Sequence, residues 1–238
     1  MIRLLAACLW GLVLLSLQAG PATAGAWPRE AGTGFVSLSQ WQSGGGGTGY
    51  TALYLEYGLT KRLTLGVDAG RSVAGRGKAV VFLRTPIMRV LGGRVALELG
   101  YGEISRQPVL RPGLSWGRSL SRPRWQGWVA VDTRLEWGLD SKTLDEKTDF
   151  TLGVTLRDPQ GKPEDWTFML QLQTGVVDIG KQLFLLQTEG IEPGASFLRL
   201  VPSITYELRD GMHLELAFFH ALDATGSQGI KLGLWSRF

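Results

Sequence analysis

Few side chains in this chain could carry catalysis. The 238 residues include two histidines, His213 and His220, and one cysteine, Cys8. The acidic residues are scattered, with neither an HExxH pair nor the spacing of an EF-hand loop. Glycines fill residues 44–47, but no Lys-Ser or Lys-Thr follows to make a phosphate-binding loop. We therefore expect no metal, no cofactor and no catalytic residue.

Charged residues instead follow a strict alternation with apolar ones. Leu63, Leu65 and Val67, for example, alternate with Thr64, Gly66 and Asp68. This period of two is typical of β-strands with one apolar and one polar face. It recurs in segments of about ten residues separated by turns, and predicts twelve strands, at residues 33–42, 49–58, 62–72, 78–87, 93–102, 109–118, 126–137, 146–157, 165–175, 197–208, 211–221 and 228–238.

The polar faces of these strands collect most of the charge. Acids and bases are mixed on them, and the set is Glu56, Asp68, Glu98, Asp132, Glu136, Asp149, Glu207 and Glu215 with Arg62, Lys78, Arg84, Arg94, Arg111, Arg134, Arg157, Arg199, Lys231 and Arg237. If the sheet closes with this face inward, the candidates that line one belt of its interior are Glu56, Asp68, Arg84, Glu98, Arg111, Asp132 and Arg134. Such a belt is either the mixed-charge wall of a pore with a slight preference for anions or a salt-bridge network that occludes the barrel. Large inward side chains such as Tyr54, Phe82 and Trp235 favour a narrow or occluded lumen.

Three features favour a membrane barrel over a soluble one. Glycines accompany the charges on the polar face, where a crowded interior needs small residues. Aromatic residues lie near strand ends on the apolar face, as in interfacial girdles: Tyr57, Trp116, Trp166, Tyr206 and Phe238 near one rim, Tyr101, Trp137 and Phe150 near the other. The connections alternate between compact ones, expected in the periplasm, and longer ones, expected outside; residues 158–164 break this rule. We place residues 176–196 in a long external loop, although 182–187 could be a further strand.

The first 24 residues have the pattern of a secretory signal. Arg3 precedes an apolar run at residues 4–17, which is too short to span a bilayer, and Ala22-Thr23-Ala24 fits a cleavage site. The alternative is a lipoprotein signal at Cys8, but most of the apolar run follows this cysteine rather than preceding it. We expect cleavage after Ala24, with residues 25–238 forming the barrel and no cysteine left.

The last seven residues, LGLWSRF, form an amphipathic segment that ends in an aromatic residue, Phe238. This resembles the closing strand of bacterial outer-membrane barrels, which the barrel-assembly machinery recognises. With the AWPRE start of residues 26–30 and the LRLVPSITYEL segment of residues 198–208, the whole chain from residue 25 is similar to small outer-membrane β-barrels of Gram-negative bacteria, some of which are labelled transporters. The resemblance implies an all-β, antiparallel up-and-down transmembrane barrel of about twelve strands in the outer membrane.

Three functions are compatible with this interpretation. The first is a narrow channel or uptake protein for small solutes, and the second is a structural or adhesive barrel whose external loops bind a partner. The third is an outer-wall lipid hydrolase, in which His220 would activate a serine; no serine partner is identifiable, so His220 is more simply an interfacial residue. His213 is expected to cap the lumen. The expected partners are outer-membrane lipid and, through Phe238 and the last strand, the assembly machinery. We expect a monomer and no nucleic-acid partner, because the net charge of +4 comes from interspersed acids and bases.

Overall fold

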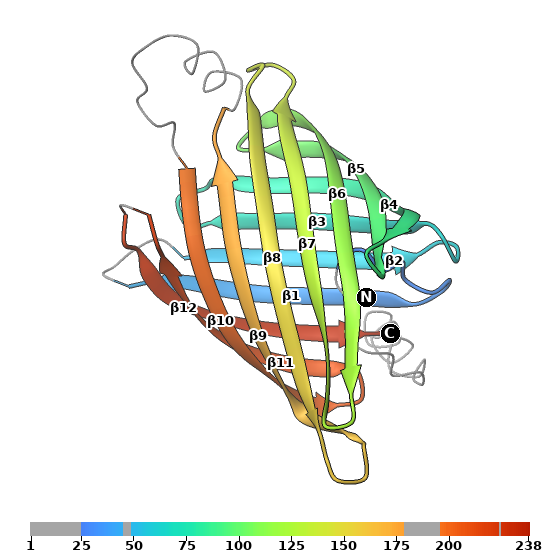
Figure 1. Cartoon of the computed structure of the whole chain (residues 1–238). Coiled ribbons are helices and arrows are strands. Elements are labelled where there is room, and N and C mark those ends of the chain that lie inside the picture. Colours follow the sequence, from blue (N-terminus) through green and yellow to red (C-terminus); the bar gives the residue numbers. More distant parts are fainter. Residues whose placement is uncertain (1–24, 45–48, 179–195, 224) are drawn as a thin grey trace, which may run out of the picture.

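The computed structural model describes residues 25–44, 49–178, 196–223 and 225–238, and these form one antiparallel barrel. The prediction of twelve strands is confirmed. Their bounds are β1 Gly34–Ser43, β2 Tyr50–Gly58, β3 Thr64–Ser72, β4 Gly77–Val90, β5 Gly93–Ile104, β6 Gln107–Arg122, β7 Trp125–Gly138, β8 Leu144–Arg157, β9 Pro163–Val176, β10 Ser196–Arg209, β11 Met212–Ala221 and β12 Gln228–Arg237. Strands β6 to β10 have 14 to 16 residues and extend beyond β1 to β3, which have 9 or 10 (Figure 1).

Each strand pairs with the next along the chain, and the last strand closes the barrel on the first. At this seam Val36 lies opposite Ser236 and Leu38 opposite Leu234. The chain end prolongs the ladder, because the backbone N–H of Phe238 donates to the carbonyl of Gly34 at 3.1 Å. A side-chain carbon on Gly34 would lie 2.2 Å from the Phe238 ring, so the ring packs directly over the glycine on the outer face. The terminal aromatic is thus part of the closing seam.

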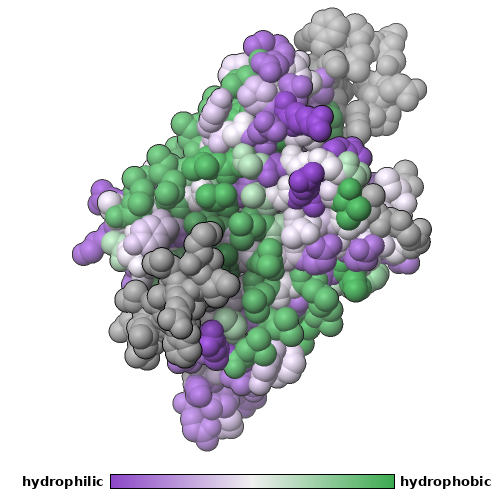
Figure 2. Space-filling view, turned by 180° about the vertical axis from the view of Figure 1, so that it is seen from behind, coloured by the Kyte–Doolittle hydropathy of each residue, from purple (hydrophilic) through white to green (hydrophobic). Residues whose placement is uncertain are grey.

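The two faces of the barrel wall differ sharply in burial. On β11 the outward Leu214, Leu216 and Phe218 are 46–51% exposed, whereas the inward Glu215, Ala217 and Phe219 are at most 3% exposed. Figure 2 shows hydrophobic side chains in a broad area across the middle of one face, with hydrophilic ones toward the ends of the molecule. The apolar face therefore points outward, as predicted. Among the described residues no helix is long and apolar enough to cross a membrane.

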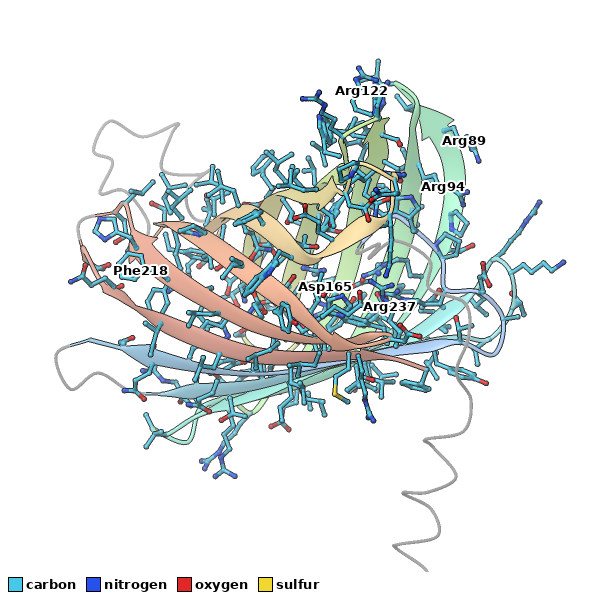
Figure 3. All side chains as sticks on the ribbon, turned by 90° about the horizontal axis from the view of Figure 1, so that it is seen from below. Arg89, Arg94, Arg122, Asp165, Phe218 and Arg237 are labelled. Atoms are coloured by element: carbon cyan, nitrogen blue, oxygen red, sulfur yellow. The ribbon has the colours of Figure 1, made fainter. Side chains whose placement is uncertain are left out.

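The connections lie at two rims. The terminal rim holds the end of β12 and the connections at residues 59–63, 91–92, 123–124, 158–162 and 210–211. The fully described connections at the loop rim are those at 73–76, 105–106 and 139–143. Figure 3 labels Arg89, Arg94 and Arg122, which belong to the ends of β4, β5 and β6 near the terminal rim.

The compact connections predicted near residues 59–61, 91–93 and 209–211 all lie at the terminal rim, but one loop-rim connection is shorter than the prediction allows. Ser105 and Arg106 make a two-residue turn there, with φ of 50° and 68°. Positive φ at both central residues is the geometry of a type I′ hairpin turn, which matches the twist of its strands without any need for length. The expected signal segment, residues 1–24, and the ambiguous residues 182–187 lie outside the described residues.

Residues 25–33 precede the first strand of the barrel wall; residues 25–29 lie inside the lumen at the terminal rim, and residues 30–32 form an exposed turn that leads into β1. Ala26 is fully buried, and the Trp27 ring lies against the inward face of Gly117 on β6. The Arg29 backbone N–H donates to Thr64 Oγ1 on β3 at 3.0 Å. We call residues 25–33 the plug segment. The sequence had led us to assign residues 25–238 to the barrel as a whole; the plug segment lacks alternation, so no strand pattern marked its position.

The exposed leucines of the outer wall yield the first testable prediction. Leu99, in the middle of β5, is 58% exposed and points outward. Replacing it with arginine places a charge at mid-height on the lipid-facing wall, which costs about 2–4 kcal/mol in a bilayer. We expect Leu99→Arg to lower the free energy of unfolding from lipid vesicles by this amount, measured by denaturant titration. Ala74→Arg, in an exposed loop, is the matched control. Equal stability of the two variants would show that the outer wall faces water.

Candidate functional site

Most of the deeply buried charged residues on β2 to β6 form a network around Arg84 on β4. The Arg84 side chain is 1% exposed. Its Nη1 donates to Glu56 Oε1 on β2, and its Nη2 donates to Glu98 Oε2 on β5 at 2.6 Å. Nη2 also lies 3.1 Å from the Tyr54 hydroxyl, and Nη1 donates to the carbonyl oxygen of Gly25 in the plug segment at 3.0 Å. One guanidinium thus joins three strands and the plug segment.

Glu98 links Arg84 to a second arginine. Arg111 on β6 donates through Nη2 to Glu98 Oε1 at 3.2 Å and through Nη1 to Asp68 Oδ2 at 2.7 Å. Lys78 on β4 also donates to Asp68, at 2.9 Å. Each carboxylate in this chain of contacts therefore has two cationic partners. Such pairing offsets the desolvation of charges that the barrel withdraws from water.

The plug segment completes the network at Glu56. Arg29 Nε donates to Glu56 Oε2 at 2.6 Å, and the Tyr54 hydroxyl donates to Glu56 Oε1 at 2.6 Å. Arg29 also lies over the ring of Phe35, 4.7 Å from its centroid. The plug segment is therefore held by a charge-assisted bond to the wall, in addition to the packing of Trp27.

Aromatic rings support the arginines. Phe82 lies between the two guanidinium groups, with Cζ of Arg84 at 5.0 Å and Cζ of Arg111 at 5.6 Å from its ring centroid. Tyr54 stacks on the same ring at 5.8 Å. On the neighbouring strand a side-chain carbon at Gly66 would lie 2.0 Å from the Phe82 ring, so only glycine leaves room for it. Rings and glycines together hold the charged groups in fixed positions.

The remaining candidates, Asp132 and Arg134 on β7, border this network with looser contacts. Arg134 lies 3.6 Å from both Glu98 and Asp149. Asp132, 8% exposed, accepts a hydrogen bond from Ser115 Oγ at 2.5 Å. The structure therefore places all seven candidate residues on the inner face of β2 to β7 and joins six of them through shared ion pairs; Asp132 stands beside them. Their role in binding a solute stays a prediction.

Two further predictions concern single residues. Arg62, expected on the inward face, lies in the exposed connection before β3, because the strand begins only at Thr64. His213 points inward near the terminal rim, 8% exposed, with its Nε2 3.9 Å from Glu207 Oε2 and its ring 6.3 Å from that of Trp235. It thus lies where a residue that caps the lumen was expected.

The other half of the lumen, formed by β8 to β12 and β1, is less charged and less filled. It contains a cavity of about 270 Å³ between the plug segment and the wall. Uncharged polar side chains such as Thr151, Gln171 and Ser203 line it, together with Trp235. Lys231 also borders the cavity and donates to Glu215 at 2.8 Å. The barrel is therefore divided into a half filled by the Arg84 network and a half with open space, and Asp132, Arg134 and Asp149 border the cavity where the two halves meet.

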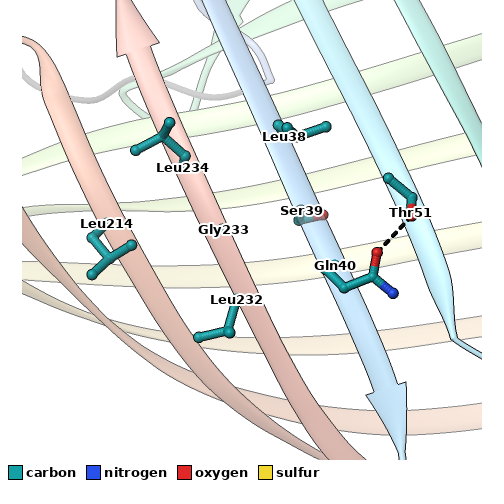
Figure 4. A pocket seen from close by; sticks show the side chains of 8 residues that line it. All are labelled: Leu38, Ser39, Gln40, Thr51, Leu214, Leu232, Gly233 and Leu234. Carbon is teal, nitrogen blue, oxygen red and sulfur yellow. Dashed lines mark hydrogen bonds between the residues drawn. The ribbon is translucent and has the colours of Figure 1, made fainter.

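The outer wall carries a shallow groove rather than a polar site. The groove, also about 270 Å³, is lined mainly by leucines of β1, β11 and β12 (Figure 4). At its edge Thr51 donates to Gln40 at 2.5 Å, and no titratable side chain lines it. Elsewhere on this wall His220 is exposed and pairs in register with Leu200 and Gln228. Among the described residues no hydrogen bond joins His220 to a serine, so nothing here favours the hydrolase interpretation.

The barrel architecture is similar to that of solved outer-membrane proteins. Over 84% of this chain and 98% of the other, it matches the NanC porin with a TM-score of 0.56 and 10% identity. The KdgM porin matches with a TM-score of 0.56 and 7% identity, over 86% and 99%. The COG4313 outer membrane channel from Pseudomonas putida F1 matches with a TM-score of 0.50 and 11% identity, over 93% and 100%. No protein-family model and no curated protein sequence matches the chain. At these identities the likeness establishes the fold, which is that of an outer-membrane porin or channel.

Sequence reasoning missed one member of the site, Arg29, and did not place one inward ion pair. Arg29 follows no alternation, and its only signal was a basic residue shortly after the expected cleavage site. The Lys231–Glu215 pair was recognised as inward, but its separation from the main network was not, because alternation assigns a face without assigning neighbours across the lumen.

The Arg84 network generates the second prediction. Arg84→Ala leaves Glu56 and Glu98 each with one cationic partner fewer in a confined space. Breaking a buried pair costs about 3–5 kcal/mol, and we expect a loss near the lower end because Arg29 and Arg111 remain. Chemical denaturation of the protein refolded in detergent measures the change.

Two further variants make this test specific. Arg122→Ala, which removes an exposed arginine, should change stability by less than about 0.5 kcal/mol. Arg84→Ala combined with Glu56→Gln should recover part of the loss. Wild-type stability in Arg84→Ala would mean that water solvates these charges and that the network is not structural.

Proposed function

We propose that this protein is a narrow passive channel for small hydrophilic solutes in the outer membrane of a Gram-negative bacterium. The terminal rim then faces the periplasm and the loop rim faces the exterior. Support for the location comes from the closed barrel with an apolar outer wall and from the outer-membrane porins and channel that share this architecture. Fold alone does not assign a function, so the proposal depends on the lumen.

The observation that carries the proposal is the cavity beside the plug segment. Its volume of about 270 Å³ has room for several water molecules, and its walls offer hydroxyl, amide and charged groups. A wholly structural barrel gains nothing from a hydrated space of this kind. The plug segment and the Arg84 network fill the opposite half of the lumen, so any path through the barrel is narrow. Small solutes can pass such a path, and large ones cannot.

Single-channel recording tests this function. Purified full-length protein in planar lipid bilayers should show small discrete conductance steps. A variant lacking residues 26–31, which keeps Gly25 after the expected cleavage site, should show larger steps because the plug segment no longer occupies the lumen. Deleting Ser141 and Lys142 from an exposed loop is the control and should leave the step size unchanged.

The rival function, a structural or adhesive barrel, gives a different result. If the barrel is structural or adhesive, neither the wild-type protein nor the variant without the plug segment should show discrete conductance steps. Steps of equal size in both proteins would show that the plug segment does not narrow the path.

The proposal includes removal of residues 1–24 as a signal peptide. The position of Gly25 supports it: this residue lies inside the lumen with φ of 75°, and a side-chain carbon there would be 2.5 Å from Asp132 Oδ1. That carbon and the backbone nitrogen would share one Cα, so the nitrogen lies within about 5 Å of the carboxylate. Cleavage after Ala24 would turn this nitrogen into an ammonium group beside Asp132, which has no other cation within ion-pair distance among the described residues.

The reactivity of this amino group tests the processing step. Mass spectrometry of the purified protein should give a chain that begins at Gly25. In Asp132→Asn the α-amino group should react faster with an amine-acylating reagent at neutral pH, because the carboxylate no longer favours the unreactive ammonium form. Asp165→Asn, at the exposed start of β9 (Figure 3), should react as the wild type does. A chain that begins at another residue would contradict cleavage after Ala24. Equal acylation rates in the wild type, Asp132→Asn and Asp165→Asn would contradict an ion pair between the α-ammonium group and Asp132.

A further inference from the structure

The inward-facing basic side chains near the loop rim are not all neutralised. Lys78, Arg111, Lys147 and Lys231 each lie within 2.9 Å of a carboxylate oxygen. Arg199 on β10 differs: among the described residues it has neither an ion pair nor a hydrogen bond, and its Nε is buried without a partner. One positive charge in the lumen therefore has no carboxylate in direct contact with it among the described residues, and Asp223 attracts it only at longer range.

Arg199 is held by aromatic rings instead of by an acid. Its Cζ lies 5.0 Å from the ring centroid of Phe219 on β11 and 6.0 Å from that of Trp41 on β1. A cation–π contact fixes the position of a guanidinium without cancelling its charge, and it leaves the N–H groups free to bind an anion in the plane of the guanidinium. Aromatic support of this kind makes Arg199 available to a solute.

Among the described residues, the acid that interacts electrostatically with Arg199 is Asp223, whose oxygens are engaged elsewhere. Asp223, in the exposed connection after β11, accepts hydrogen bonds from the Leu198 backbone N–H at 3.3 Å and from the backbone and hydroxyl of Thr225 at 2.9 and 2.5 Å. These bonds lower the pKa of Asp223, with the hydroxyl contributing most, so its charge persists while its oxygens serve the turn. It does not close an ion pair with Arg199.

A second cation lies deeper on the same wall. Arg199 is opposite Ala221 of β11, and Lys231 is opposite Ala217 of the same strand. The backbones of the two cations are therefore separated by four residues along the strand direction, or about 13 Å. The Lys231 ammonium lies 5.1 Å from the Trp41 ring centroid and also borders the cavity. Trp41 therefore contacts both cations; of these, Lys231 borders the cavity and is paired with Glu215, whereas Arg199 is not among the cavity-lining residues.

We propose that Arg199, supported by Phe219 and Trp41, is an anion-binding station at the loop-rim mouth of the lumen, and that it passes small inorganic anions or carboxylates toward Lys231 and the cavity. The inference deepens the proposed channel function by naming its solute class, and it rests on that function for the transport step only. Binding at Arg199 does not require an open path to the other rim.

Ion selectivity tests the transport step. In planar bilayers with an about tenfold KCl gradient, the reversal potential of the wild-type channel should indicate a preference for chloride. Arg199→Ala should reduce the chloride-to-potassium permeability ratio by about threefold, and Arg199→Lys should largely retain it, because the positive charge persists. Arg76→Ala, which removes an exposed loop arginine from the same rim, should leave the ratio unchanged. Potassium acetate added at the loop rim should reduce the chloride current through the wild type but not through Arg199→Ala.

Fluorescence quenching tests the binding step independently of conductance. The fluorescence of Trp41 is the part of the emission that is lost in Trp41→Phe, and iodide should quench it in the wild type. In Arg199→Ala, iodide should quench this fluorescence less than in the wild type. Caesium, a cation, should quench it in Arg199→Ala at least as well as in the wild type. The inference would be overturned if Arg199→Ala kept both the permeability ratio and the iodide quenching of the wild-type protein. If iodide quenching depends on Arg199 but the protein shows no conductance steps, the result would support anion binding at Arg199 and contradict the channel function.

Discussion

The structure depends on the compensation of charges inside a barrel whose outer wall is apolar. A closed sheet has only two faces, and the period of two sends every second side chain inward. Because the outward positions at mid-height hold leucine, valine and aromatic residues, the charged residues of β2 to β7 lie in the interior except near the strand ends. Arg84, Arg111 and Lys78 there meet Glu56, Glu98 and Asp68 at 2.6 to 3.2 Å, apart from the still closer Arg84–Glu56 contact. Without these contacts the barrel would enclose uncompensated charge, which is among the costliest states for a folded protein.

The same compensation divides the lumen. Where strands carry closely matched acids and bases, the side chains reach across to one another and fill the interior, with Phe82 and Tyr54 between them. Where strands β8 to β10 carry threonine, glutamine and serine, the side chains are shorter and satisfied locally, as in the Thr155–Thr167 contact at 2.6 Å. Space is left on that side, and the cavity lies there. The filled half and the open half of the lumen thus differ because charged residues are unevenly distributed along the chain, while the backbone forms a regular barrel throughout.

The plug segment connects the two halves. Gly25 and Arg29 bind to the charged side through Arg84 and Glu56, and both residues also border the cavity. The segment that narrows the lumen is therefore attached by the same ion pairs that stabilise the wall. A change in those pairs would alter both stability and passage, which links the structural and the proposed functional roles of the network.

The sequence by itself determined the number of strands, the face of nearly every residue and the orientation of the charged belt, because side-chain direction in a strand follows from position parity alone. It also marked Phe238 as part of a terminal amphipathic strand. It could not determine which inward residues meet: Arg84 and Glu98 are neighbours in register, but Arg29 and Glu56, or Arg111 and Asp68, come together only when strands distant in sequence curve around one lumen. Nor could it show that residues 25–29 lie inside the lumen or that Arg199 has no carboxylate in direct contact among the described residues. Those facts are set by the curvature and closure of the barrel, which bring groups together across an interior that no local pattern describes.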